Sequence, residues 1–336
     1  MTRRKKVRIK DIAKELNISY SAVSQAINHP REVSRQTVKN VLAKCQELGY
    51  VKILSNKKRK GAIGIIAQDI YNLAIGEFYN FVLKGVLEEC QKRKIRLEVE
   101  FLPEGGLPLM ISNNTVDGVL LFGKITKDLA LALKQKGLPM LLVGHPIPHV
   151  ELHTVMVDGR AGMHDVTRHL LDLGHKKIAL IYSKPIYDYI TADRMEGYRT
   201  ALTEARLKIR DEYIVEAYWC EPISAYNATK SLLKMKDRPT AIIYMNDTMA
   251  YRSYKAFAEE GVKIPKDISI AGFDDMPLPD YVWPFKPTLT SVGVDREMIG
   301  KTSVDVLMNL TENPSKLALR YTLPVELRVK ESTAKT

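Results

Sequence analysis

Polar side chains that could bind a small molecule follow several apolar segments in the later part of the chain. Asp274 follows SIAGF, Asn246 follows AIIYM, and Trp219 ends YIVEAYW. A carboxylate can accept hydrogen bonds from two sugar hydroxyls or from an amine, and an indole ring can stack on the apolar face of a pyranose. Arg194 lies just inside an expected helix start, and its guanidinium fork can bind two neighbouring hydroxyls or a carboxylate in fixed geometry.

Three further side chains extend this set of binding candidates. Asp69 and Tyr71 stand at and just after the end of the first long apolar run, and Asp158 lies where the pattern of the chain starts again. Carboxylates, an arginine, an amide and an aromatic ring together indicate a polar, hydroxyl-rich ligand, most simply a sugar or a nucleoside. Other interpretations stay open, because Trp219 could fill a core, Asp158 could serve structure and Arg194 could be a surface arginine.

Two regions with the same rhythm of elements would position these side chains. Apolar runs typical of strands covered on both faces alternate with stretches of helical period, which predicts βαβ units and parallel sheets. The rhythm starts again after 154–158, so we expect two doubly wound lobes of similar size. Ligands bind such sheets at the carboxyl ends of the strands, and a cleft between the lobes is the expected pocket. Strands are expected at 62–69, 96–102, 117–123, 138–144, 175–183, 213–219, 239–247 and 267–275, and helices at 77–94, 127–136, 162–173, 192–205, 225–234 and 248–260.

A different constellation occupies residues 1–50. Apolar spacing predicts helices at 9–16, 20–28 and 35–48, with Ser19 and Ser34 as the N-caps of the second and third. Two helices joined by a short turn form the helix-turn-helix arrangement, whose second helix enters the major groove of DNA. The buried stripe of the third helix is expected to contain Val38, Val41, Leu42, Cys45 and Leu48.

Polar side chains on the second of these helices are candidates for reading bases. Tyr20, Ser21 and Gln25 are the expected base readers, since glutamine suits the paired donor and acceptor of adenine. Short hydroxyl and amide side chains suit phosphate oxygens, which position a protein without specifying sequence. The expected phosphate contacts are Ser19, Ser24, Asn28, Ser34 and Thr37. For Ser24 and Asn28, hydrogen bonding to local backbone groups is the alternative.

The positive charge of the chain is concentrated at its amino end. Residues 1–60 contain 16 Lys and Arg against 4 Asp and Glu, whereas the whole chain has 51 and 39, which leaves 35 of each for 61–336. A basic head on a neutral body is typical of contact with nucleic-acid phosphates. A solvated basic tail is the alternative for residues 3–6.

The head resembles that of the LacI/GalR family of bacterial transcription regulators through KDIAKELNISYSAVSQAIN and VSRQTVKNVLAKCQELGY. The family often has Arg where this chain has Gln25, so the operator sequence cannot be transferred from relatives. The body resembles the periplasmic-binding-protein-like core of the same family. That likeness rests on GHKKIALI, the T-x-x-R-x-x-G-Y pattern of Thr191, Arg194, Gly197 and Tyr198, the pair Asn246 and Asp247, GFDD at 272–275 and LPVEL at 323–327.

The charge boundary and the resemblance together imply a domain plan. A helix-turn-helix domain is expected at 1–50, a basic linker or hinge at 51–61 and an effector-binding core at 62–336. The resemblance implies that the chain crosses between the lobes more than once. The expected first lobe covers 62–160 and 291–322, and the expected second lobe covers 161–290 and 323–332.

The linker VKILSNKKRKG contains a run of basic residues that begins at Lys57. Members of the resembling family use this region as a hinge helix whose leucine wedges into the minor groove. Here the linker is short, lacks the family's proline after the tyrosine and shows no Ala-rich helical pattern. Leu54 is the candidate wedge and Lys57 a candidate phosphate contact, with a flexible basic tether as the alternative.

Composition and motifs narrow the function further. The chain contains no Walker loop, no G-x-G-x-x-G, no G-x-S-x-G and no clustered His or Cys ligands, so neither an enzyme nor a cofactor or metal site is expected. Cys45, Cys90 and Cys220 are far apart, which indicates a reduced compartment. The amino end carries no apolar run like that of a signal peptide, and no stretch is apolar enough to cross a bilayer.

We therefore expect a cytoplasmic transcription regulator, most simply a repressor, that forms a homodimer, with a higher oligomer as the alternative. It would bind an imperfectly palindromic operator in double-stranded DNA under the control of a small effector. Whether the effector releases or tightens DNA binding is left open. The alternatives are the same regulator controlled by a protein co-regulator, a sugar-processing α/β protein, and an extracellular solute-binding protein.

Overall fold

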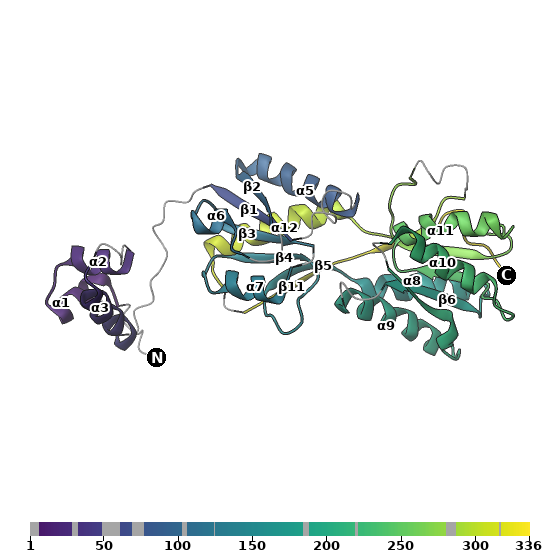
Figure 1. Cartoon of the computed structure of the whole chain (residues 1–336), viewed down its shortest axis with the longest axis horizontal. Helices are drawn as coiled ribbons and strands as arrows, with labels where there is room; N and C mark the ends of the chain where they lie inside the picture. The colour runs from purple at the N-terminus through teal and green to yellow at the C-terminus, as the bar shows by residue number, and fades with distance from the viewer. Residues whose placement is uncertain are drawn as a thin grey trace. The chain divides into compact units, whose positions relative to one another are not determined.

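The computed structural model of the chain describes residues 7–28, 33–48, 61–68, 77–102, 106–123, 125–183, 188–218, 221–279, 287–315 and 317–336. The chain forms two compact units, Met1–Arg59 and Lys60–Thr336 (Figure 1). Within these described segments, no helix combines the length and the apolar character needed to span a membrane.

The first unit contains the three expected helices, α1 (Ile9–Leu16), α2 (Tyr20–Asn28) and α3 (Arg35–Glu47). The two predicted N-caps are confirmed. The Ser19 hydroxyl accepts a hydrogen bond from the Ala22 amide at 3.0 Å, and the Ser34 hydroxyl accepts one from the Thr37 amide at 3.1 Å. The buried core consists of Ile12, Ala13, Val23, Ala26, Val41 and Cys45.

One residue expected in that core is not there. Leu42 is 53% exposed, although the helical pattern placed it in the buried stripe. Val38, Val41 and Cys45 already define the inner face at three- and four-residue spacing. Leu42 follows Val41 by one residue, about 100° around the helix, and so points away from α1 and α2.

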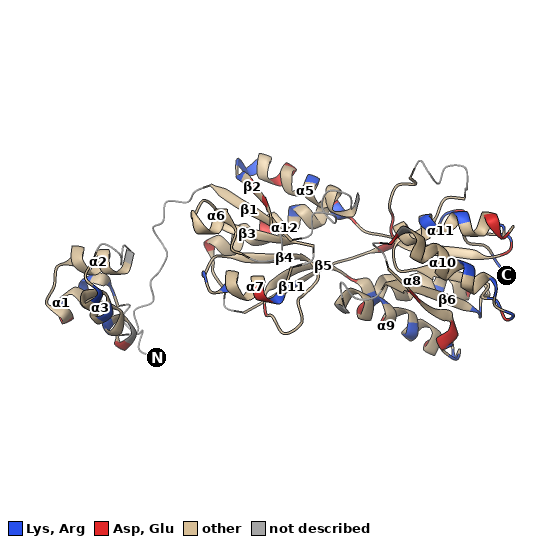
Figure 2. Cartoon of the chain, viewed as in Figure 1, with Lys and Arg blue, Asp and Glu red and all other residues tan. Residues whose placement is uncertain are grey.

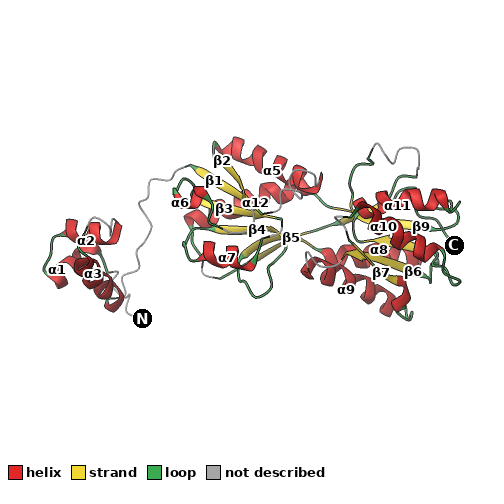
Figure 3. Cartoon of the chain, in the orientation of Figure 1, coloured by secondary structure: helices red, strands yellow, loops and turns green. Residues whose placement is uncertain are grey.

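The first lobe of the second unit is built on a parallel six-stranded sheet in the order β11-β5-β4-β3-β1-β2. Side chains on alternate positions of each strand enter two different cores: Ile63 and Ile65 face one, and Ala62 and Ile66 the other. Helices therefore cover both faces, with α5 and α12 on one and α6 and α7 on the other (Figure 3). The elements are β1 (Ala62–Ala67), α5 (Glu77–Arg93), β2 (Arg96–Phe101), α6 (Leu109–Ser112), β3 (Gly118–Phe122), α7 (Lys127–Lys134), β4 (Met140–Gly144), β5 (His153–Val157), α12 (Arg296–Glu312) and β11 (Arg320–Leu323).

The second lobe repeats this plan with the order β12-β10-β9-β8-β6-β7. All neighbouring strands are parallel except β12, which runs antiparallel to β10. Helices α8 and α9 pack on one face and α10 and α11 on the other. The elements are α8 (Gly159–Asp172), β6 (Ile178–Ser183), α9 (Asp188–Glu204), a 3-10 turn (Asp211–Tyr213), β7 (Ile214–Ala217), α10 (Pro222–Leu233), β8 (Ala241–Tyr244), α11 (Asp247–Glu259), β9 (Ser269–Asp274), β10 (Thr290–Gly293) and β12 (Glu326–Arg328).

The expected strands and helices are all present, with ends shifted by a few residues, and the predicted pair of doubly wound parallel sheets is confirmed. The chain passes between the lobes after β5, after β10 and after β11. The second passage lies after Gly293, slightly later than the expected boundary at residue 291. Its position follows from pairing, because Thr290 to Gly293 align with Ala271 to Asp274 of β9 and so belong to the second sheet.

Candidate functional site

Arg194 and Asp274 form a buried ion pair at the carboxyl edge of the second sheet. Arg194 lies on α9 and Asp274 ends β9, and the Arg194 Nη2 is 3.2 Å from the Asp274 Oδ1. Arg194 is only 7% exposed; its Nη1 donates to the Met245 carbonyl, and its guanidinium lies 3.6 Å from the centroid of the Phe273 ring. Contacts with a carboxylate, a carbonyl and a ring face therefore fix the plane of the guanidinium.

One donor of this fixed guanidinium is unused within the structure. The Arg194 Nε is buried and has no hydrogen-bond partner among the described residues. An unpaired buried donor is costly, so native proteins rarely keep one unless a ligand, an ion or water satisfies it. The same guanidinium pairs through its Nη2 with Asp274 at the carboxyl edge of the sheet, which is the place where ligands bind doubly wound sheets.

The Asp274 carboxyl group is subject to opposing electrostatic effects, and its backbone is strained. Burial raises the pKa of its carboxyl group, and the positive charges of Arg194 and Arg296 oppose that rise. The backbone φ angles of Asp274 and Asp275 are 109° and 49°, in the left-handed region that side-chain-bearing residues rarely adopt. Such strain persists only where surrounding contacts over-determine the conformation, and it is concentrated at functional sites.

The first lobe also contributes to the surroundings of Asp274. Tyr79, on α5, is partly buried; desolvation raises the pKa of its hydroxyl to about 12, and the charge of Asp274 adds to this rise. Gly144, at the end of β4, leaves the space for this ring, because a Cβ there would lie 2.9 Å from the Tyr79 hydroxyl. Groups from both lobes therefore meet at the end of β9.

Asn246 and Asp158 both cap helices at the carboxyl ends of strands. The Asn246 Oδ1 accepts a hydrogen bond from the Met249 amide at 2.9 Å, and the Asp158 Oδ1 accepts one from the Ala161 amide at 2.9 Å. The structural interpretation of Asp158 thus accounts for one of its oxygens. Asn246 keeps its Nδ2 without a partner among the described residues, so capping and ligand binding are compatible there.

Three of the expected effector residues, Asp69, Tyr71 and Trp219, lie outside the described residues.

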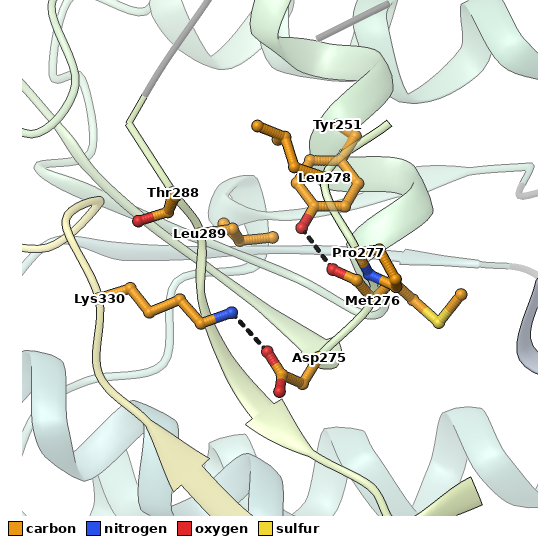
Figure 4. Close-up of a pocket in the computed structure, with 8 residues that line it drawn as sticks. All are labelled: Tyr251, Asp275, Met276, Pro277, Leu278, Thr288, Leu289 and Lys330. Atoms are coloured by element: carbon orange, nitrogen blue, oxygen red, sulfur yellow. Dashed lines mark hydrogen bonds and ion pairs between the residues drawn. The ribbon is translucent and has the colours of Figure 1, made fainter. Parts of the chain in front are cut away.

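A cavity of about 260 Å³ opens on the second lobe beside the strand end of β9 (Figure 4). Its described walls come from α11, from Asp275 and its neighbours and from residues near β10 and β12, and none of the expected effector residues that the structure describes lines it. The lining residues are Tyr251, Asp275, Met276, Pro277, Leu278, Thr288, Leu289 and Lys330.

The sequence reasoning missed residues that form hydrogen bonds to the segment at the end of β9. Asp247 is fully buried, and its carboxylate accepts hydrogen bonds from the Ser291 hydroxyl and the Met276 amide, both at 2.7 Å. Burial raises the pKa of Asp247 well above its ordinary value. Gly272 makes room for this carboxylate, since a Cβ there would lie 2.1 Å from the Asp247 Oδ1. The Asn246–Asp247 pattern was the available signal, but only its first residue was given a role.

The candidate DNA-reading surface lies on α2 of the head. Tyr20 is 60% exposed, and Ser21 and Gln25 are exposed beside it, while Val23 and Ala26 face the core. A small apolar face thus holds the helix and leaves its first turns accessible, as a helix entering the major groove requires.

The candidate phosphate contacts stand in less uniform environments. The Ser34 and Thr37 hydroxyls lie 2.8 Å apart and bond to each other, and Ser24 is partly buried with a contact of its own. The Asn28 side chain lies outside the described part of the structure, as do Leu54 and Lys57. Figure 2 shows Lys and Arg on α3 together with a few acidic residues of the head, and both signs of charge interspersed over the second unit.

Comparison with known proteins agrees with both parts of this geometry. Residues 8–52 match the family of bacterial regulatory proteins named after lacI, and residues 167–333 match the periplasmic binding protein-like domain. The HTH-type transcriptional repressor PurR of Aliivibrio salmonicida (strain LFI1238) is 30% identical over 314 residues, which cover 89% of this chain and 91% of that protein. The chain belongs to the LacI family.

Two further matches place this LacI-family chain among regulators. The ribose operon repressor of Haemophilus influenzae (strain ATCC 51907 / DSM 11121 / KW20 / Rd) is 29% identical over 323 residues, covering 92% of this chain and 93% of that protein. The crystal structure of a LacI-family transcriptional regulator from Enterococcus faecium with bound ribose superimposes with a TM-score of 0.69 at 25% identity, covering 82% of this chain and 99% of that one. The resemblance expected from the motifs is confirmed, as is the fold.

Proposed function

We propose that this LacI-family protein is a transcriptional repressor whose affinity for an operator is set by a small polar effector. The effector would bind beside Arg194 and Asp274, with Asn246 as a further contact. One observation carries the proposal: a buried guanidinium, already fixed on three sides, keeps its Nε without a partner among the described residues next to a carboxylate. The ribose bound to a family member of similar fold supports a sugar or nucleoside as the effector class.

The chemistry of the site favours vicinal hydroxyls. Arg194 supplies a fixed donor, Asp274 supplies acceptor oxygens, and both can be used by neighbouring hydroxyl groups that each donate and accept. Because Asp274 is buried, replacing one hydroxyl of the ligand by hydrogen would leave a desolvated polar group unpaired. Selectivity against deoxy analogues should therefore be strong.

The DNA side of the proposal rests on the head. Base edges in the major groove would be contacted by Tyr20, Ser21 and Gln25. Phosphates would be contacted by the short polar side chains of the head and by one linker residue: Ser19, Ser24, Asn28, Ser34, Thr37 and Lys57. Two copies of the chain would bind the two halves of an imperfect palindrome. Effector binding and operator binding would then be reciprocally linked.

The effector proposal is tested by a thermal-shift panel of sugars, nucleosides and their deoxy analogues. A ligand that binds only the folded protein raises its melting temperature by mass action. The hit should lose its effect in Arg194→Gln and keep it in Arg168→Gln, a matched variant of an arginine on the exposed part of α8 whose partner is Asp172. An equal shift in both variants would show that the ligand binds elsewhere, and a panel without any hit would favour a protein co-regulator.

The operator proposal is tested by selecting duplexes from a random pool with the full-length protein. Selected sequences should be palindromic, and Gln25→Ala should change the base preference at one position of each half-site. Lys57→Ala should weaken binding to all duplexes alike and reduce the slope of log affinity against log salt by about one. Selection of no sequence over the random pool, with the hit ligand present or absent, would refute operator binding.

A further inference from the structure

Arg296 lies at a contact between the two lobes, next to the strand end that carries Asp274. It is the first residue of α12, a helix of the first lobe. Its Nη1 donates to the Asp274 carbonyl at 3.0 Å and its Nη2 to the Asp275 carbonyl at 3.3 Å. The same guanidinium lies 4.5 Å from the centroid of the Phe81 ring on α5. One side chain thus joins the strand end that carries Asp274 to two helices of the first lobe, α5 and α12.

Side chains of the second lobe also form hydrogen bonds to the end of β9. The Asp275 amide donates to the Ser291 hydroxyl at 3.1 Å, and the Met276 amide donates to the Asp247 carboxylate at 2.7 Å. The second lobe therefore holds this segment by its N–H groups, and Arg296 of the first lobe holds it by its carbonyl groups. Because Arg296 bonds to the backbone of Asp274 itself, we expect a change at Asp274 to shift the carbonyl groups that accept hydrogen bonds from Arg296.

On the first-lobe side, helices α5 and α12 pack closely against each other. Gly85 and Gly300 bring α5 and α12 into backbone contact, because a Cβ on Gly300 would lie 2.1 Å from the Val82 carbonyl oxygen. A Cβ on Gly85 would lie 2.1 Å from the Glu297 carbonyl oxygen. Phe81 also packs against the core of the second lobe. A displacement at the start of α12 is therefore shared with α5 and not absorbed between the helices.

We propose that Arg296 is a positioning residue that couples the state of Asp274 in the second lobe to the α5–α12 pair of the first lobe. The proposal rests on the proposed function, in which Asp274 contacts the effector. The first lobe contains β1, the first described element after the linker from the head. Arg296 is then the link by which occupancy of the site reaches the part of the core that is continuous with the head.

The test is a hydrogen-exchange cycle on the full-length protein without any ligand. Asp274→Asn perturbs the second-lobe side of the site with little change in side-chain size, and the readout is amide exchange in peptides from the first two turns of α5. In the presence of Arg296 we expect Asp274→Asn to change this exchange by about threefold or more. In the Arg296→Gln background the same substitution should change it by less than about 1.5-fold.

Two variants separate coupling from a purely structural role. Arg296→Lys keeps the positive charge and one donor, so it should restore part of the change in α5 exchange that Asp274→Asn causes. Arg168→Gln should leave that change unaltered. If Arg296→Gln does not unfold cooperatively, Phe81→Leu carries the same test, since it removes the ring under the guanidinium. A merely structural Arg296 would shift exchange in α5 by itself, but the factor caused by Asp274→Asn would be unchanged.

The outcomes decide between the proposals. An equal effect of Asp274→Asn on α5 in both backgrounds overturns the coupling role, and so does the absence of any effect in either. Because no ligand is used, an empty sugar panel together with an intact exchange cycle would refute the effector class and leave the coupling standing.

Discussion

Replacement of Arg194 by glutamine should destabilise the second unit in a way that depends on pH. The substitution removes the partner of a carboxylate whose side chain is only 13% exposed and leaves that carboxylate buried. Removing one member of a buried ion pair costs about 3–5 kcal/mol. The positive charge of Arg296 remains near Asp274 and moderates the effect, so we expect about 3 kcal/mol at pH 7. For a domain of this size that lowers the melting temperature by roughly 6–12 °C.

The sign of the pH dependence follows from the raised pKa of Asp274. The folded state binds a proton at this carboxyl more tightly than the unfolded state, so folding stability falls as pH rises above the ordinary value of 3.8. Arg194 opposes the rise, so its removal should raise the pKa of Asp274 further and widen this window. The cost of Arg194→Gln is therefore expected to be largest near neutral pH and to shrink as pH falls toward 4.

Urea unfolding of the wild type, Arg194→Gln, Asp274→Asn and the double variant measures this directly. The four free energies of unfolding form a double-mutant cycle that isolates the interaction of the pair. Arg168→Gln, on the exposed part of α8, is the control and should stay within about 0.5 kcal/mol of the wild type. A coupling energy below about 1 kcal/mol, or a cost that does not change with pH, would contradict a buried, ligand-poised pair.

Three further predictions concern other parts of the chain. Burial lowers the pKa of His145 to about 4, so the folded state should lose about 3 kcal/mol of stability as pH falls from above 6.5 to 4. Urea unfolding at each pH should show that His145→Gln flattens the slope of the unfolding free energy against pH. An unchanged slope would contradict this prediction. Gly197→Ala should cost about 1–3 kcal/mol in the same assay, because its Cβ would lie 2.2 Å from the Arg160 carbonyl oxygen, and a neutral result would mean that α8 and α9 can separate. Ser19→Ala should cost the α2 cap about 1 kcal/mol and speed amide exchange in α2 roughly fivefold in the full-length chain, whereas unchanged exchange would show that the cap contributes nothing.

The regular elements were predictable because their apolar patterns are strong. The run at 62–67 alternates between two cores and needs to be apolar on both sides, so its identity as a central parallel strand is visible without a structure. The N-caps Ser19 and Ser34 were predictable for a similar local reason, since each hydroxyl bonds an amide three residues ahead. Leu42 shows the limit of this reasoning, because neighbouring positions on a short helix differ in exposure only through what packs against them.

The residues around Asp274 were less predictable because their contacts depend on where the loops run. Asp274 itself was expected at a strand end, but its left-handed backbone and its carbonyl contacts with Arg296 are properties of the assembled fold. Nothing in the spacing of Asp247 and Ser291 indicates that the two side chains meet. Ser291 reaches Asp247 because β10 pairs with β9, and Arg296 reaches Asp274 because the chain crosses to the first lobe after β10; periodicity alone located neither.

The strained strand end of β9 explains why these distant contacts belong together. Two consecutive residues in the left-handed region are stable only if several groups hold them, and the structure supplies these from α9, α11, β10 and α12. Three of these elements belong to the second lobe and one to the first, so the strain is shared across the boundary between lobes. A ligand that accepts a hydrogen bond from Arg194 would change the contact between α9 and Asp274, and the contacts from α11, β10 and α12 would then readjust. Of these, the contact made by Arg296 is the one that would carry the change to the first lobe.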